Sequence, residues 1–199
     1  MLRRRALLVV ACFQIALATP VHAQRTIDLD AATITEINAA FDAGTLTSEL
    51  LVKRYLARIT AFDQQGPRIH AIIALNTTAL ATARALDAER KTKGKRSPLH
   101  GIPIVLKDNY NTRDLPTTGG SVLLEGYIPS RDAYVVQKLR DAGAIILAKV
   151  NMSEFASSGA YSSLGGQTLN PHDLGVSPSG SSGGTGAAIA AAFAQFGLG

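Results

Sequence analysis

The chain has 199 residues, of which 46% are hydrophobic and 18% are charged. This balance is typical of a globular protein with a sizeable core, and it excludes a disordered or fibrous chain. The formal net charge of +5 falls to +2 once Arg3, Arg4 and Arg5 are set aside, since 17 basic residues then face 15 acidic ones, and so small a charge indicates neither nucleic acid nor anionic lipid as a partner.

The first 23 residues are expected to form a cleaved secretory signal. Three arginines precede an apolar run of 13 residues from Ala6 to Ala18, and Val21-His22-Ala23 offers the small residues that a signal peptidase requires. We therefore expect a secreted or periplasmic protein, residues 24–199, without stable membrane contact after cleavage. An uncleaved anchor is disfavoured because the run falls short of the ~20 apolar residues of a spanning helix. A lipoprotein modified at Cys12 is disfavoured because apolar residues continue beyond that cysteine.

The sequence that follows the expected signal indicates neither a metal site nor a reactive thiol. The precursor has one cysteine, Cys12, which lies in the expected signal. Without it the chain has no disulfide, no thiolate nucleophile and no cysteine ligand for a metal. The histidines are widely spaced and no HExxH motif occurs, so we expect neither a metal nor another cofactor.

Helices and strands are expected to alternate along the chain. The capping box Thr33-Ile34-Thr35-Glu36 predicts a helix that ends at Gly44. Capping residues and periodic or continuous apolar runs predict the later elements. These are a helix from Thr47 or Ser48 to Phe62, a strand at 69–75, a helix from Asn76 to Lys91, a strand at 101–106, a helix from Ser130 to Arg140, a strand at 144–148 and a helix at 186–196.

This order of elements predicts the fold class. Strands that alternate with helices are typical of an α/β fold, with a mixed, largely parallel sheet flanked by helices. Ile102–Leu106 and Ile145–Leu147 are expected to be inner strands. Gly197-Leu198-Gly199 is expected to turn into a further strand, and the last strand before Gly199 should lack a neighbour, which leaves the sheet edge open and apolar surface exposed.

Lys107 is the first candidate for chemistry. It ends the apolar strand GIPIVLKDN, and ligands gather at the carboxyl ends of strands in α/β folds. If apolar neighbours bury the amine, desolvation lowers its pKa toward the range in which it accepts a proton. The alternative is a lysine at a strand end that simply reaches water.

The second candidate is the segment from Ser177 to Gly186, SPSGSSGGTG, which ends a stretch of about thirty residues without a predicted element. A flexible linker is disfavoured because a helix follows at once. A phosphate-binding loop is disfavoured because GxxxxGK[ST] is absent. Nucleophilic chemistry is the third possibility. In that case Gly180-Ser181-Ser182-Gly183-Gly184 formally matches a G-x-S-x-G elbow with Ser182 as nucleophile, but the elbow needs a strand directly before it and NPHDLGVSPS is unsuited to one.

Three motifs together resemble the amidase-signature family. They are GIPIVLKDN, GAIILAKVNMSEFA and GGQTLNPHDLGVSPSGSSGGTGAAIAA, in this order, and the resemblance covers roughly Thr33 to Gly199. It implies the amidase-signature fold, with residues 24–199 as the N-terminal part of the domain. One departure is Ser179, where the family commonly has glycine.

The resemblance also implies a Ser–cis-Ser–Lys triad. Lys107 matches the lysine base, and Ser181 matches the bridging serine that follows a cis peptide bond. The nucleophilic serine and the oxyanion hole are expected beyond Gly199, so these 199 residues are expected to be inactive alone. Phe155, Ser157, Gly180 and Ser182 are expected to contribute to substrate binding or to support the loop.

The implied activity is hydrolysis of a small-molecule amide to an acid plus ammonia or an amine, through an acyl-enzyme. The alternative is a non-catalytic protein that binds amides or a partner on the same scaffold. A transamidase that acts with a tRNA partner also belongs to the family, but an export signal argues against it. Neither the particular amide nor the oligomeric state follows from the sequence.

Overall fold

The computed structural model of the protein describes residues 27–199, and the expected signal, residues 1–23, lies outside them. The helices are α1 (Ile34–Asp42), α2 (Ser48–Ile59), α3 (Ala79–Lys93), α4 (Tyr134–Asp141) and α5 (Gly183–Ala190), with the short turns η1 (Thr60–Gln64), η2 (Val122–Leu124) and η3 (Glu154–Ala156). The strands are β1 (Ile72–Leu75), β2 (Pro103–Lys107), β3 (Ile145–Val150), β4 (Tyr161–Ser162), β5 (Gly166–Gln167) and β6 (Phe196–Leu198).

Strands β2 and β3 form the centre of a four-stranded sheet with the order β1-β3-β2-β6. β2 runs parallel to both β3 and β6, whereas β1 is antiparallel to β3. Both central strands are buried along their whole length, as expected of parallel strands that are covered on both faces. The predicted mixed, largely parallel sheet and its two inner strands are therefore confirmed.

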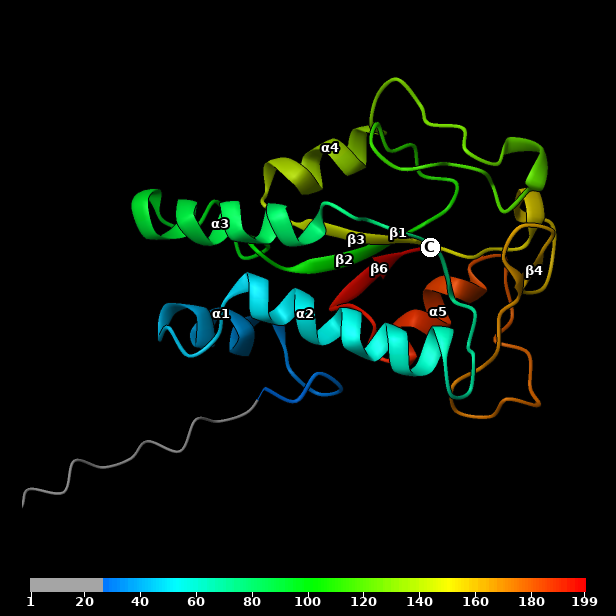
Figure 1. Cartoon of the computed structure of the whole chain (residues 1–199), viewed down its shortest axis with the longest axis horizontal. Helices are drawn as coiled ribbons and strands as arrows, with labels where there is room; N and C mark the ends of the chain where they lie inside the picture. The colour runs from blue at the N-terminus through cyan, green and yellow to red at the C-terminus, as the bar shows by residue number, and fades with distance from the viewer. Residues whose placement is uncertain (1–26) are drawn as a thin grey trace, which may run out of the picture.

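Helices cover the sheet on both sides. In the view of Figure 1, α3 and α4 lie above the sheet, and α1, α2 and α5 lie below it. The sequence explains how the first two helices begin: the Thr33 hydroxyl accepts from the Glu36 amide, and the Glu36 carboxylate accepts from the Thr33 amide, which is the predicted capping box. α2 begins with Thr47, whose hydroxyl accepts from the amide of Leu50.

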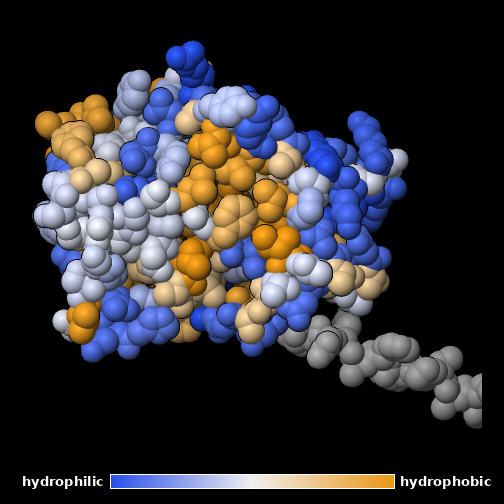
Figure 2. Space-filling view, turned by 180° about the vertical axis from the view of Figure 1, so that it is seen from behind, coloured by the Kyte–Doolittle hydropathy of each residue, from blue (hydrophilic) through white to orange (hydrophobic). Residues whose placement is uncertain are grey.

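The structure corrects the expected course of the chain at its C-terminal end. The Ala-rich helix was expected to continue to Phe196, but α5 ends at Ala190, and Phe196 already pairs with Ile104 on β2. Helix propensity gives way here to a strand pairing between residues far apart in sequence. Gly197 and Leu198 were expected to turn into a further strand, but they belong to β6 themselves. Within residues 27–199, β6 has only β2 as a neighbour, whereas the strand at 145–150 is paired on both sides. Figure 2 shows a broad hydrophobic area at the centre of the face behind that of Figure 1, the side on which α4, β6 and α5 lie.

Other expectations about element ends were also wrong: α2 ends at Ile59 and not at Phe62, and α3 begins at Ala79 and not at Asn76. Ser130 does not cap a helix, because α4 begins only at Tyr134, with Ala133 as its N-cap residue. The strand expected at 69–75 is shorter, because His70 has a φ of 54° and so leaves the extended conformation. The loop that was expected to lack elements contains the hairpin of β4 and β5, residues 161–167.

Candidate active site

Lys107 is the last residue of β2 and is only 6% exposed. It belongs to a central strand, because β2 lies between β3 and β6 in the sheet. Burial lowers the pKa of the Lys107 amine, because desolvation disfavours its charged form. The strand end thus holds an amine that gives up its proton more readily than a lysine in water, which was one of the two possibilities that the sequence left open.

The serine pair approaches Lys107 from the start of α5. Ser181 and Ser182 directly precede the first residue of this helix, and the peptide bond between Gly180 and Ser181 is cis, as the resemblance implies. Within residues 27–199 no strand leads directly into Ser182, which speaks against a G-x-S-x-G elbow. Ser181 lies 74 positions after Lys107, so tertiary contacts and not local chain geometry bring the two side chains together.

Both serine hydroxyls contact the lysine amine. Lys107 Nζ donates to Ser181 Oγ at 2.7 Å and to Ser182 Oγ at 2.8 Å. The Ser181 contact lies within the range that proton transfer between these groups requires. Ser182 was expected only to support the loop, but its hydroxyl contacts the amine directly. Ser182 therefore also helps to fix the position of the amine.

The end of β3 holds the serine pair in place through the main chain. The amide of Ser153 donates to the Ser181 carbonyl at 3.0 Å, and the amide of Gly184 donates to the Asn151 carbonyl at 3.1 Å. A Cβ on Gly184 would lie 2.2 Å from that carbonyl oxygen, so only glycine allows this approach. The segment that follows β3 therefore supports the serines through its main chain, while β2 carries the lysine.

The four residues expected at the substrate or the loop fall into two groups. Gly180 and Ser182 flank Ser181, and Gly180 packs so closely on Gly159 that an added Cβ would lie 1.6 Å from its carbonyl oxygen. Phe155 and Ser157 are exposed and lie at the turn after β3. No hydrogen bond within residues 27–199 joins these two side chains to Lys107 or the serines.

Ser179 occupies the position at which the sequence departs from the family pattern. Its φ is 64°, in the left-handed region that glycine adopts without strain. A side chain in this conformation costs roughly 1–2 kcal/mol. The glycine of the family pattern therefore fits the observed backbone better than the serine of this chain does.

Sequence reasoning missed a buried ion pair beneath the same strand ends. Lys149 Nζ lies 3.1 Å from Asp108 Oδ1, and both side chains are almost completely buried. Burial lowers the pKa of Lys149, while the carboxylate of Asp108 opposes this shift. The Asp108 carboxylate also accepts from the amide and hydroxyl of Thr118. A lysine near the end of an otherwise apolar strand was the available signal.

Glu154 is a second residue that sequence reasoning missed. Its carboxylate accepts from the Ser121 hydroxyl at 2.7 Å and from the Ser163 amide at 2.9 Å. These hydrogen bonds hold the pKa of Glu154 below its ordinary value. Glu154 thus joins the turn that contains Phe155 to two neighbouring loops.

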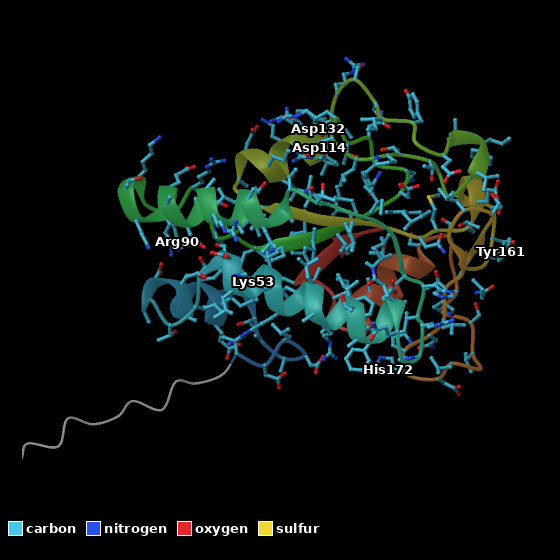
Figure 3. The ribbon with its side chains drawn as sticks, in the orientation of Figure 1. Lys53, Arg90, Asp114, Asp132, Tyr161 and His172 are labelled. Atoms are coloured by element: carbon cyan, nitrogen blue, oxygen red, sulfur yellow. The ribbon has the colours of Figure 1, made fainter. Side chains whose placement is uncertain are left out.

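Figure 3 shows how far apart the two ends of the sheet lie. Tyr161, on the hairpin next to the strand ends, lies at one end of the molecule, and Arg90 on α3 lies at the other. Within the part of the chain that the structure describes, no group of three or more His, Cys, Asp or Glu side chains could hold a metal ion. No helix among residues 27–199 is long and apolar enough to cross a membrane.

This geometry allows one kind of chemistry directly. A buried amine with a lowered pKa can accept a proton from a hydroxyl at hydrogen-bonding distance and later return it. Lys107 and Ser181 meet this requirement, and the glycines around the serine pair leave its backbone close to neighbouring segments.

Known proteins with similar sequences point in the same direction. A family model described as Amidase matches residues 50–199. The chain is 45% identical over 174 residues to a component of the glutamyl-tRNA(Gln) amidotransferase of Acidothermus cellulolyticus, a match that covers 86% of this chain and 34% of that protein. The chain thus spans about a third of the length of the curated relatives it matches.

Solved structures give the same result. The native peptide amidase of Stenotrophomonas maltophilia superposes with a TM-score of 0.80 at 46% identity, over 82% of this chain and 34% of that one. An amidase family protein of Bacillus anthracis superposes with a TM-score of 0.81 at 37% identity, over 90% and 39% of the two chains. The fold, the motifs and these matches agree, and the chain belongs to the Amidase family, of whose members it corresponds to an N-terminal portion.

Proposed function

We propose that the full-length protein hydrolyses carboxylic amides and that Lys107 and Ser181 form its proton relay. The observation that carries this proposal is the 2.7 Å contact between a buried lysine amine of lowered pKa and a serine hydroxyl. A serine is a poor nucleophile until a base removes its proton, and a neutral lysine is suited to this task. The peptide amidase similarity supports the same reaction class.

The reaction proceeds in two halves. We place the nucleophilic serine in the part of the full-length protein that follows Gly199. This serine attacks the amide carbon, its proton passes to Ser181 Oγ, and the Ser181 proton passes to Lys107 Nζ. The C–N bond then breaks, and the same relay returns the proton to the departing ammonia or amine. Water hydrolyses the acyl-serine by the reverse path, which releases the acid and restores the relay.

Substrate contacts are the next part of the proposal. Phe155 is 59% exposed at the turn after β3, and Glu154 fixes this turn to two neighbouring loops. We assign Phe155 and Ser157 to the wall of the substrate site, and Gly180 and Ser182 to its floor beside Ser181. The substrate class is a small-molecule amide, and the protein is exported by residues 1–23.

The experiment measures ammonia release from simple amides by the full-length protein, with hydroxylamine as a competing acceptor. Hydroxamate forms when an acyl-enzyme is present, because hydroxylamine attacks the acyl-serine. Lys107→Met is expected to abolish both products. Lys53→Met is the matched control, because Lys53 lies on α2 and its side chain is 54% exposed (Figure 3).

A non-catalytic protein would give a different result. It would bind amides, detected as a rise in melting temperature, without forming acid or hydroxamate, and this outcome would overturn the proposed hydrolysis. An amidotransferase is the second candidate, favoured by the 45% identity to a component of such an enzyme. It would prefer glutamine among the amides tested, and the export signal expected at residues 1–23 argues against it.

A further inference from the structure

Asn151 is a buried polar residue for which the proposed relay has no role. It directly follows β3, and its side chain is completely buried. The carboxamide nitrogen donates to the Gly166 carbonyl and to Thr168 Oγ1, both at 3.0 Å. The carboxamide oxygen accepts from the Ser162 hydroxyl at 2.7 Å and from the Met152 amide at 2.9 Å. Every hydrogen-bonding position of this side chain is therefore used.

These contacts join Asn151 to the hairpin of β4 and β5. Ser162 lies on β4, and Gly166 lies on β5. The hairpin is short, so it has little hydrogen bonding of its own to fix it. A Cβ on Gly165 would lie 2.5 Å from the Asn151 carboxamide oxygen, which shows how closely the turn of the hairpin wraps around this side chain. Asn151 therefore acts as the internal support of the hairpin.

The main chain of the same residue carries the start of α5. The Asn151 amide donates to the Ala71 carbonyl at 2.7 Å, and its carbonyl accepts from the Gly184 amide at 3.1 Å. Two residues further on, the Ser153 amide donates to the Ser181 carbonyl at 3.0 Å. The backbone of residues 151–153 thus supports the serine pair and the start of α5 through main-chain hydrogen bonds.

We infer that Asn151 is a positioning residue that holds Ser181 and Ser182 against Lys107. Its carboxamide fixes the course of the chain after β3, and the main chain of residues 151–153 transmits this position to the serines. The inference rests on the proposed function, because positioning matters only if Lys107 and Ser181 form the relay. Asn151 itself need not contact the substrate.

The decisive substitution is Asn151→Asp in the full-length protein. The carboxylate has the same shape, but it has no N–H to donate and would face the Gly166 carbonyl. We expect kcat to fall by about 30-fold or more, while KM changes by less than about threefold, because proton transfer depends more steeply on the distance from Ser181 to Lys107 than substrate binding does. We also expect the acidic limb of kcat/KM to move to higher pH, because withdrawal of the serines lets water reach Lys107.

Asn38→Asp is the matched control. Asn38 is also buried, on α1, and its carboxamide nitrogen donates to the carbonyls of Ile34 and Pro98 at 2.9 and 2.8 Å. The same chemical change there removes one hydrogen bond within α1 and one from α1 to the loop at Pro98, and neither involves Lys107 or the serines. We expect kcat and the pH profile to stay within about twofold and a few tenths of a pH unit of the parent protein.

A gentler pair of variants keeps the test valid if Asn151→Asp does not fold. Thr168→Val removes the hydroxyl that accepts from Asn151, whereas Thr168→Ser keeps it. We expect Thr168→Val to lower kcat by about three- to tenfold and Thr168→Ser to restore it. Folded Asn151 or Thr168 variants that match the Asn38 control in kcat and pH profile would overturn the inference.

The proposed function fails by a separate result. If Lys107→Met leaves hydrolysis intact, the relay is wrong whatever Asn151 does. If Lys107→Met abolishes hydrolysis while Asn151→Asp behaves like Asn38→Asp, only the positioning role is lost.

Discussion

Gly184 lies in the first turn of α5, where a methyl group has no room. A Cβ at this position would lie 2.2 Å from the Asn151 carbonyl oxygen and 2.5 Å from its amide nitrogen, both of them main-chain atoms. To reach even the 3.0 Å that Cβ contacts require, the start of α5 has to move by about 0.8 Å away from β3. The serine pair directly precedes this turn, so we expect it to move with the helix.

This displacement is large compared with the tolerance of the hydrogen bond between Lys107 and Ser181. Added to the present 2.7 Å, it takes Ser181 Oγ about 3.5 Å from Lys107 Nζ, beyond the usual range of a hydrogen bond. Gly184→Ala should therefore lower kcat by about 100-fold in the full-length protein. Overpacking should also lower the free energy of unfolding by about 1–3 kcal/mol. Steady-state kinetics of amide hydrolysis and urea unfolding measure these two effects.

Gly186→Ala is the control on the same helix. Among residues 27–199, no atom of another segment lies within 4 Å of a Cβ at Gly186. Alanine is the better helix former by roughly 0.5–1 kcal/mol, so this variant should be slightly more stable and equally active. If Gly184→Ala keeps kcat within about twofold of the parent, the contact between β3 and α5 does not set the relay distance, and the reasoning is refuted.

Lys107→Met and Ser181→Ala should each lower kcat by about three orders of magnitude, and the double variant should be no worse, because a proton relay fails as a unit. Ser182→Ala should cost less, since Ser181 still contacts the amine; complete loss there with a nearly silent Ser181→Ala would make Ser182 the nucleophile. The rate kcat/KM should rise with pH through the lowered pKa of Lys107, and an acidic limb near the ordinary lysine value of 10.5 would contradict its burial. Between that lowered pKa and 10.5 the folded protein binds fewer protons than the unfolded chain, so the free energy of unfolding should rise with pH. Urea unfolding at several pH values measures this rise, and Lys107→Met should make it smaller. Mass spectrometry of the protein from its host should find Gln24 at the N-terminus, whereas intact Met1 in a cytosolic fraction would contradict export.

The sequence predicted those parts of the fold that depend on local signals. The capping box at Thr33 and the buried strands β2 and β3 follow from residue types at fixed spacing. The end of α5 did not follow, because the main-chain turn at Ala192, with a φ of 50°, depends on the pairing of β6 with β2. In an Ala-rich segment the side chains are too uniform to indicate the residue at which the helix ends.

The site divides in the same way. Lys107 and Ser181 were predictable because their motifs are specific, and the structure places their reactive atoms in contact. The roles of Asn151 and Ser153 were not predictable from residue type, because Ser153 uses its main-chain amide and Asn151 uses a fully satisfied side chain. Main-chain hydrogen bonds between segments far apart in sequence do not depend on residue type and so leave no direct signal in the sequence.

The separation of 74 residues between Lys107 and Ser181 has a consequence for the order of folding. The entropy cost of closing a loop grows with its length. The contact between Lys107 and Ser181 is therefore expected to form only after β2 and β3 have paired and the hairpin of β4 and β5 has packed in place. Contacts that form last and involve exposed loops are also the first to open. Mild denaturant should therefore abolish hydrolysis before the central strands lose their protection from hydrogen exchange, and the amides of Ser153 and Gly184 should exchange ahead of those of β2.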